Sequence, residues 1–251
     1  MYQIETPYTI GLDLGQASDF TAICVLESQL WMPAAILAEY PWQGLAPGWN
    51  SPSLMNTHAL SLALTHGKPW PNKPPLHLRH LERMRGKPYP DIVTRVAEMV
   101  QQPPFTDCGY ALVVDATGVG APVVDLFRQA EIPVMAIMIH GGDAVTPIPG
   151  EFYGQLGGYR VPKRDLVAAL QSVLQAGRLV IAEGLELAPE FRKESQNFKV
   201  RIDPKTAHDS YSHWREGQHD DLVLATAMGC WFRDYFWRHH DAQRIQRRDA
   251  A

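Results

Sequence analysis

The 251-residue sequence predicts an α/β fold in which helices flank a mixed β-sheet. Two β-rich runs, residues 8–14 and 20–26, lie on either side of a short stretch containing Gly15, a pattern typical of an antiparallel hairpin. Two further apolar runs, residues 110–115 and 134–139, are separated by a helical pattern, which predicts parallel strands joined by a right-handed crossover. A hairpin and a parallel pair in one chain make the expected sheet mixed.

The remaining helices and strands are predicted from apolar spacing and from Gly and Pro. Residues 91–101 carry apolar side chains at helical spacing before a Pro-Pro pair, and another helix begins at Pro162 and ends at a glycine. Residues 219–237 are apolar on nearly all sides until Arg233, so we expect a long helix buried against the sheet. Shorter elements are expected at residues 122–130 (helix), 178–182 (strand), 185–195 (helix) and 198–202 (extended).

Three stretches are expected to be irregular. Nine of the twenty prolines fall in residues 41–90, which we interpret as an irregular Pro/Trp-rich arm inserted into a single domain of residues 1–237. Residues 141–158 are rich in glycine and are expected to form a loop. Residues 238–251 form a basic tail, expected to be either a disordered DNA-contacting extension or a soluble chain end.

Composition excludes several classes of protein. A net charge of -4 means that any polyanion would have to meet a local basic patch. The three cysteines are far apart and form no C-x-x-C pair, which argues against a disulfide scaffold or a structural zinc site. The longest apolar stretch, residues 222–232, is shorter than the roughly 18 residues of a membrane span. We therefore expect an intracellular, soluble protein with no membrane partner.

Acidic residues end two of the predicted strands and begin the last predicted helix. Asp13 closes the first strand, Asp115 closes the run YALVVD, and Asp220 and Asp221 precede the apolar helix. Ligands of α/β sheets gather beyond the carboxyl ends of the strands, and a buried acid needs a partner. Hard divalent cations take oxygen ligands, and two such ions clamp a phosphodiester. Each acid alone also has a structural explanation, as a turn or helix-start residue.

Five motifs occur in an order that resembles the nuclease domain of phage terminase large subunits, within the ribonuclease H-like superfamily. They are GLDLGQASDFTAIC, VVDATGVGAPVVDLF, VPKRDLVAALQSVLQAGRLVI, FRKESQNFKVRI and EGQHDDLVLATAMG. The resemblance covers most of the chain except residues 41–90 and the tail. It implies a ribonuclease H-like sheet and a metal-dependent endonuclease that cuts concatemeric viral DNA during genome packaging by two-metal phosphodiester hydrolysis.

The same resemblance assigns metal ligands by matching motif. Asp13 corresponds to the first ligand, Asp115 to the second, and Asp221 or its neighbour Asp220 to the third. Consecutive helical residues point about 100° apart, so the two neighbours are not expected to make equal contacts, and we favour Asp221. The implied cofactor is Mg²⁺ or Mn²⁺, with two ions expected.

Two further residues are candidates for assisting roles. His219 would add a ligand or a proton-transfer group, although a histidine at a helix entry also hydrogen-bonds the backbone. Asp19 matches an acid found after the first strand in the resembled family, and a turn position explains it equally.

A basic region is the candidate DNA-binding surface. Residues 160–215 hold ten Lys or Arg against seven Asp or Glu. Lys163 and Arg164 begin a helix, where exposed N–H groups favour phosphate. The alternative is that these side chains are solvated helix faces. The other candidates are Arg192, Lys193, Lys199 and Arg201.

The sequence lacks the motif G-x-x-x-x-G-K-[ST] of a packaging motor, so it resembles the nuclease part alone. The expected partners are double-stranded DNA and a separate packaging ATPase, small terminase subunit or portal, in the cytoplasm of a bacterial host. Three alternatives remain open at this point. They are a Holliday-junction-resolvase-like nuclease, an actin-like ATPase or sugar kinase suggested by GLDLG, and an inactive DNA-holding module.

Overall fold

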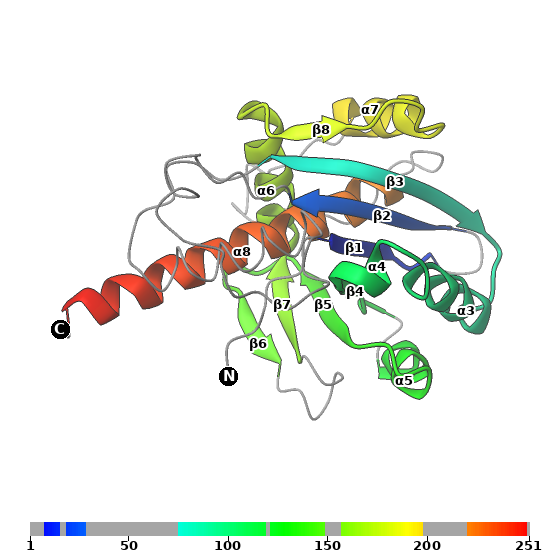
Figure 1. Ribbon diagram of the computed structural model, residues 1–251, viewed down its shortest axis with the longest axis horizontal. Helices are drawn as coiled ribbons and strands as arrows, with labels where there is room; N and C mark the ends of the chain where they lie inside the picture. Colours follow the sequence, from blue (N-terminus) through cyan, green and yellow to red (C-terminus); the bar gives the residue numbers. More distant parts are fainter. Residues whose placement is uncertain are drawn as a thin grey trace, which may run out of the picture.

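The computed structural model describes residues 8–15, 19–28, 75–118, 121–148, 157–197 and 220–249, with the backbone alone for residues 236–249. The strands of its eight-stranded sheet are β1 (Tyr8–Asp13), β2 (Phe20–Ser28), β3 (Leu76–Arg85), β4 (Tyr110–Asp115), β5 (Val134–His140), β6 (Thr146–Ile148), β7 (Gly158–Pro162) and β8 (Leu179–Ile181). The helices are α3 (Tyr89–Val100), α4 (Phe105–Cys108), α5 (Ala121–Gln129), α6 (Lys163–Gln175), α7 (Ala188–Asn197) and α8 (Asp221–Asp249). Figure 1 shows how they are arranged.

The sheet is mixed, in the order β6-β7-β5-β4-β1-β2-β3-β8. Strands β1, β2 and β3 are antiparallel neighbours, whereas β1, β4, β5 and β7 run parallel. This arrangement confirms the predicted hairpin, the predicted parallel pair and the predicted mixed sheet. Because β3 runs in the same direction as β1 and β4, the carboxyl ends of all three strands lie at one edge.

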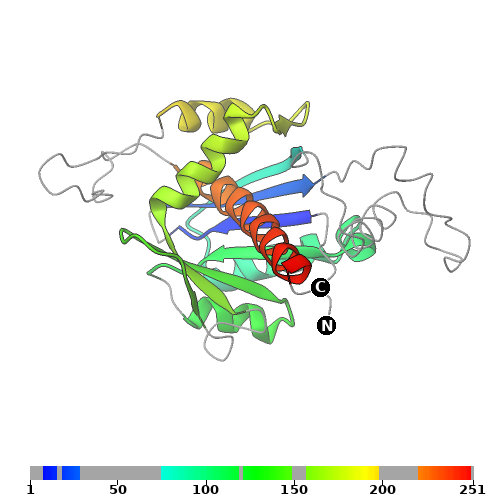
Figure 2. The same ribbon diagram turned by 90° about the vertical axis from the view of Figure 1, so that its left-hand side faces the viewer.

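Helices cover both faces of the sheet. Helices α6, α7 and α8 pack on one face, and α3, α4 and α5 on the other, each over its own apolar core. Figure 2 shows α8 lying across the strands with α6 beside it. The strand period of two divides β1 between these cores: Ile10 and Leu12 face the α3 side, so Gly11 and Asp13 face α8.

Gly11 is what brings α8 close to the sheet. A Cβ atom at this position would overlap the carbonyl oxygen of Ala225 and would lie 3.0 Å from the Cys24 sulfur. A glycine therefore allows the backbone of α8 to touch the backbone of β1. The contact lies one turn from the start of α8 and two residues from the end of β1, so it places Asp221 near Asp13.

The prediction of an irregular arm over residues 41–90 is wrong for the last part of this range. Residues 76–85 form β3, and α3 begins at Tyr89. The period of two was hidden by a β-bulge. Opposite the consecutive residues Val25 and Leu26, the pairing passes from His80 to Leu78, so the buried leucines change from even to odd positions. Residues 29–74 lie outside the described part of the chain.

Two more expectations need correction. The predicted loop 141–158 contains β6, a three-residue edge strand too short to show a period, and β7 begins at Gly158. The predicted tail after residue 237 is helical, because α8 continues to Asp249. The expected extended segment 198–202 lies outside the described residues. In the described ranges, no helix combines the length and the apolar character needed to cross a membrane.

Candidate metal centre

Asp13 and Asp115 end two adjacent parallel strands at the same level of the sheet. Leu12 pairs with Val114, and each aspartate is the next residue of its strand. Both side chains are on the face covered by α8, since they share it with Gly11 and Val113. Both are buried, at 8% and 9% exposure. The structure therefore brings together two of the acids that the sequence predicted at strand ends.

Asp221 supplies a third carboxylate from the first turn of α8. The residue is buried, and its charge acts on Asp13. Leu224 donates its backbone N–H to the carbonyl oxygen of Asp220 at 2.8 Å, so the helical hydrogen bonds begin at this point. The contact between Gly11 and Ala225 then holds this helix end against β1.

The carboxyl group of Asp13 lies in a strongly acidic environment. Burial raises its pKa well above the ordinary value, and the charges of Asp115, Asp221 and Asp220 raise it further, in that order. Lys163 opposes this effect. A buried carboxylate surrounded by three others is destabilised unless protons or cations are added.

Asp115 is held in place by the turn that follows β4. The backbone N–H of Thr117 donates to Asp115 Oδ1 at 2.7 Å, and Ile139 donates its N–H to the Thr117 hydroxyl at 2.6 Å. Burial raises the pKa of Asp115 to about 6, while the hydrogen bonds from Thr117 and the charge of Lys163 act in the opposite direction. The side chain is thus fixed in orientation but remains costly to ionise.

The two neighbouring acids at the start of α8 have different cationic contacts. Lys163, the first residue of α6, places Nζ 3.3 Å from Asp220 Oδ2, with side-chain exposures of 15% and 25%. Asp221 is contacted instead by Arg83 of β3, at 3.7 Å. Asp221 is also the more buried of the two and affects Asp13 more strongly. Greater burial and a stronger effect on Asp13 thus distinguish Asp221 from Asp220.

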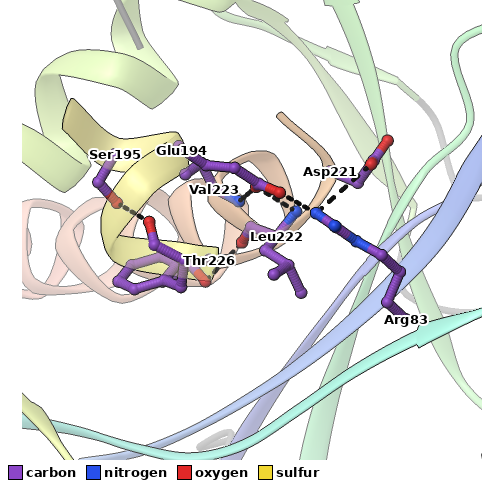
Figure 3. A network of polar contacts seen from close by, with 8 residues as sticks. Arg83, Glu194, Ser195, Asp221, Leu222, Val223 and Thr226 are labelled. Atoms are coloured by element: carbon purple, nitrogen blue, oxygen red, sulfur yellow. Dashed lines mark hydrogen bonds and ion pairs between the residues drawn. The ribbon is translucent and has the colours of Figure 1, made fainter. Parts of the chain in front are cut away.

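Arg83, Glu194 and Asp221 form a network that the sequence did not reveal (Figure 3). Arg83 Nη2 is hydrogen-bonded to Glu194 Oε1. Glu194 Oε2 accepts the backbone N–H groups of Leu222 and Val223, at 3.1 and 3.3 Å. These are among the first N–H groups of α8, which have no partner within the helix.

Glu194 carried one signal that would have identified it. It lies three residues after the buried Phe191, on the apolar side of α7, and an acid there requires a buried partner. Arg83 carried no such signal, because its strand lay in the region expected to be irregular. Thr117 was hidden because its contact with Asp115 depends on the shape of the turn.

Carboxylate oxygens are the ligand type that Mg²⁺ and Mn²⁺ take, and the acidic excess around Asp13 fits a cation. Within the described ranges, no three His, Cys, Asp or Glu side chains are arranged closely enough to enclose a metal ion as they stand. Hard ions such as Mg²⁺ keep several waters and bind substrate phosphate, so they need few protein ligands.

The other predicted residues fall into three groups. Asp19 is exposed and lies directly before β2, and Arg192 and Lys193 are exposed on α7. Arg164 is partly exposed and contacts Asp143, with Nη1 2.6 Å from Oδ1. None of these four belongs to the described interactions of the acidic cluster. His219, Lys199 and Arg201 lie outside the described residues.

Comparison with known proteins gives structural neighbours only. No family model matches the chain, and no curated protein matches its sequence significantly. The large terminase nuclease from thermophilic phage G20c with bound magnesium has a TM-score of 0.52 and 17% identity, covering 91% of this chain and 82% of that one.

Two other structures of the same phage nuclease, also 17% identical, cover 91% of this chain. One has a TM-score of 0.48 and is covered over 83% of its length; the other, with bound zinc, has a TM-score of 0.44 and is covered over 82%. The fold expected from the five sequence motifs is thus confirmed by the magnesium-bound structure. This chain has the fold of the large terminase nuclease.

Proposed function

We propose that this protein is a divalent-metal-dependent DNA endonuclease of the large terminase kind. The observation that carries the proposal is the environment of Asp13, a buried carboxylate that faces three other acids, with Lys163 opposing their effect. The shared fold supports it, because the neighbour is a nuclease with bound magnesium.

Asp13, Asp115 and Asp221 would hold the ions, one from each of three elements that meet at the sheet edge. Bound divalent ions would lower the pKa of a water and stabilise the charge that develops on the phosphodiester. The chain's own contribution is orientation: Thr117 fixes Asp115, and α8 carries Asp221 to the end of β1. We propose two ions, Mg²⁺ or Mn²⁺.

The substrate we propose is double-stranded viral DNA, cut during genome packaging. Lys163 begins α6 next to the acidic cluster, and its charge would bring a phosphate to the ligands. Arg164, Arg192 and Lys193 would add weaker phosphate contacts. The partners would be a separate packaging ATPase, a small terminase subunit or a portal, in the cytoplasm of a bacterial host.

The test is cleavage of supercoiled plasmid by purified protein in Mg²⁺, in Mn²⁺ and in chelator. Asp115→Asn is the test variant, because it keeps the size of the side chain and removes its charge. Asp125→Asn is the matched control, since this aspartate is half exposed on α5, on the opposite face. We expect metal-dependent cutting by the wild type and the control alone. Cutting in chelator, or by Asp115→Asn, would overturn the proposal.

A further inference from the structure

The network of Arg83, Glu194 and Asp221 places the guanidinium group of Arg83 beside Asp221, a proposed metal ligand (Figure 3). The three side chains come from β3, α7 and α8 and are 14%, 8% and 12% exposed. Arg83 reaches this place because its strand is in register with the site. Asp13 pairs with Ala22, and Ala22 pairs with Arg83. Asp13 and Arg83 therefore lie at the same level of the sheet and on the same face.

The same guanidinium nitrogen serves both acids unequally. Arg83 Nη2 makes its hydrogen bond to Glu194, whereas Asp221 Oδ2 lies 3.7 Å from it, beyond hydrogen-bond distance. The ring of Phe20 lies on the guanidinium, with 4.9 Å between the ring centroid and Cζ. Burial lowers the pKa of Arg83, and the charges of Asp221 and Glu190 oppose this effect, but an arginine stays protonated.

Glu194 is itself firmly held. One of its oxygens accepts two backbone N–H groups of α8, so the carboxylate stays in place while its other oxygen binds Arg83. If the charge of Glu194 were absent, the nearest carboxylate for the arginine would be that of Asp221. An arginine that paired fully with Asp221 would compete with a divalent cation for the same oxygens.

We propose that Glu194 is a positioning residue that holds Arg83 back from Asp221 and so keeps the Asp221 carboxylate available to metal. This inference rests on the proposed function, since it concerns the proposed third ligand. The role differs from helix capping alone. A cap would serve α8 whether or not Arg83 were present, whereas the proposed role exists only because Arg83 is there.

Glu194→Gln separates these two roles. The amide oxygen of glutamine can still accept the N–H groups of Leu222 and Val223, which leaves the amide NH₂ facing the guanidinium. Two donors then face each other, and Arg83 turns to Asp221. We expect the variant to fold and to bind Mn²⁺ about 10- to 100-fold more weakly, the range typical for loss of a residue that orients a metal ligand.

The double variant Arg83→Gln/Glu194→Gln is the decisive comparison. It removes one positive and one negative charge, so the net charge of the site is unchanged. Without the competing arginine, the Mn²⁺ affinity should return to within about threefold of wild type. The remaining loss would be small beside the loss expected for Glu194→Gln alone. Arg83→Gln alone should not weaken Mn²⁺ binding.

The experiment is calorimetric titration of the full chain with Mn²⁺ in the absence of DNA, with circular dichroism and thermal unfolding of each metal-free variant as the fold check. Recovery of affinity in the double variant supports the inference. Wild-type affinity in Glu194→Gln, or a double variant as weak as the single one, overturns it while leaving the proposed function intact. A wild-type protein that bound no Mn²⁺ would overturn both.

Discussion

Two acids of the sheet, Glu82 on β3 and Asp13 on β1, have pKa values that are shifted in opposite directions. Glu82 of β3 lies next to His80 and Arg95, and the hydrogen bond from His80, followed by those from Arg95, lowers its pKa to about 2 despite partial burial. Arg95 binds it with two nitrogens, at 2.9 and 3.0 Å. Asp13 lies among three other carboxylates, and its pKa is raised.

The difference in pKa follows from the described side chains nearby, which are basic around Glu82 and mostly acidic around Asp13. The charge of Glu82 is balanced by His80 of the same strand and by Arg95 of α3, 13 residues away in the sequence. Among the described residues at the edge formed by β1 and β4, the four acids Asp13, Asp115, Asp220 and Asp221 outnumber the basic groups described in contact with them, Lys163 and Arg83. Perturbed carboxylates of this kind are typical of functional sites. We interpret the excess as the place of divalent cations.

Removal of one ligand should produce the largest effect. Asp13→Asn keeps the volume of the side chain but removes the charge at the centre of the cluster. Metal-assisted stabilisation of the transition state amounts to several kcal/mol, so plasmid cleavage should fall by at least about 10³-fold. Glu82→Gln is the control, because the charge of Glu82 is balanced by Arg95, and this variant should cleave DNA normally. Loss of activity in both variants would show that the contrast between the two acids is false.

The pH dependence of stability should distinguish Asp115 of the acidic cluster from Glu82 next most clearly. The folded-state pKa of Asp115 is raised to about 6 from an ordinary value of 3.8, so the folded state holds its proton more tightly. Its contribution to stability is present below about pH 4 and is lost as the pH rises to about 6. Asp115→Asn has no such proton and avoids this loss.

The measurement is denaturant unfolding of the metal-free protein at pH 4 and pH 8. Relative to wild type, Asp115→Asn should gain on the order of 3 kcal/mol more at pH 8 than at pH 4, from about 1.4 kcal/mol per pKa unit. Saturating Mn²⁺ should stabilise the wild type and not the variant. An equal effect of the substitution at both pH values would contradict the account.

Lys163 should produce a smaller effect, on DNA binding. Lys163→Met keeps the aliphatic length but removes a charge that faces Asp220 and lowers the pKa values of Asp13 and Asp115. With Ca²⁺ in place of Mg²⁺, the salt dependence of DNA affinity should become shallower by about one charge. Arg192→Gln, on the exposed face of α7, is the comparison and should change the slope less. A slope unchanged by Lys163→Met would contradict a role of this lysine in binding DNA.

The smallest effect is expected for Glu82, whose charge is balanced by Arg95. The lowered pKa of Glu82 means that its ion pairs contribute stability above about pH 4.5, and that this contribution is lost as the pH falls towards 2. Glu82→Gln should therefore destabilise the protein by about 1 kcal/mol or less near pH 7. The difference from wild type should shrink towards pH 2, which urea unfolding at several pH values would detect. A destabilisation that grew at low pH would have the wrong sign.

The sequence predicted those parts of the site that depend on local patterns. Asp13 and Asp115 each end an apolar run, and Asp221 begins an apolar helix, so their places at one edge followed from the α/β fold. Contacts between distant segments did not follow. The pairs Lys163 with Asp220 and Arg83 with Glu194 join residues 57 and 111 positions apart.

The missed elements have physical reasons as well. The bulge in the pairing of β2 with β3 hid the strand that carries Arg83. Strand β7 has five residues, begins with a glycine and ends with a proline, so its composition resembles a loop although all five residues pair with β5. Short strands of this kind are defined by their neighbours in the sheet.

We propose that the edge formed by Asp13, Asp115 and Asp221 binds divalent cations. The most direct measurement is anomalous X-ray scattering from crystals of the protein grown with Mn²⁺. We expect one or two Mn²⁺ peaks bound by carboxylate oxygens of Asp13 and Asp115, with Asp221 as the third ligand. Full occupancy of Mn²⁺ at another place, with none between these aspartates, would contradict it.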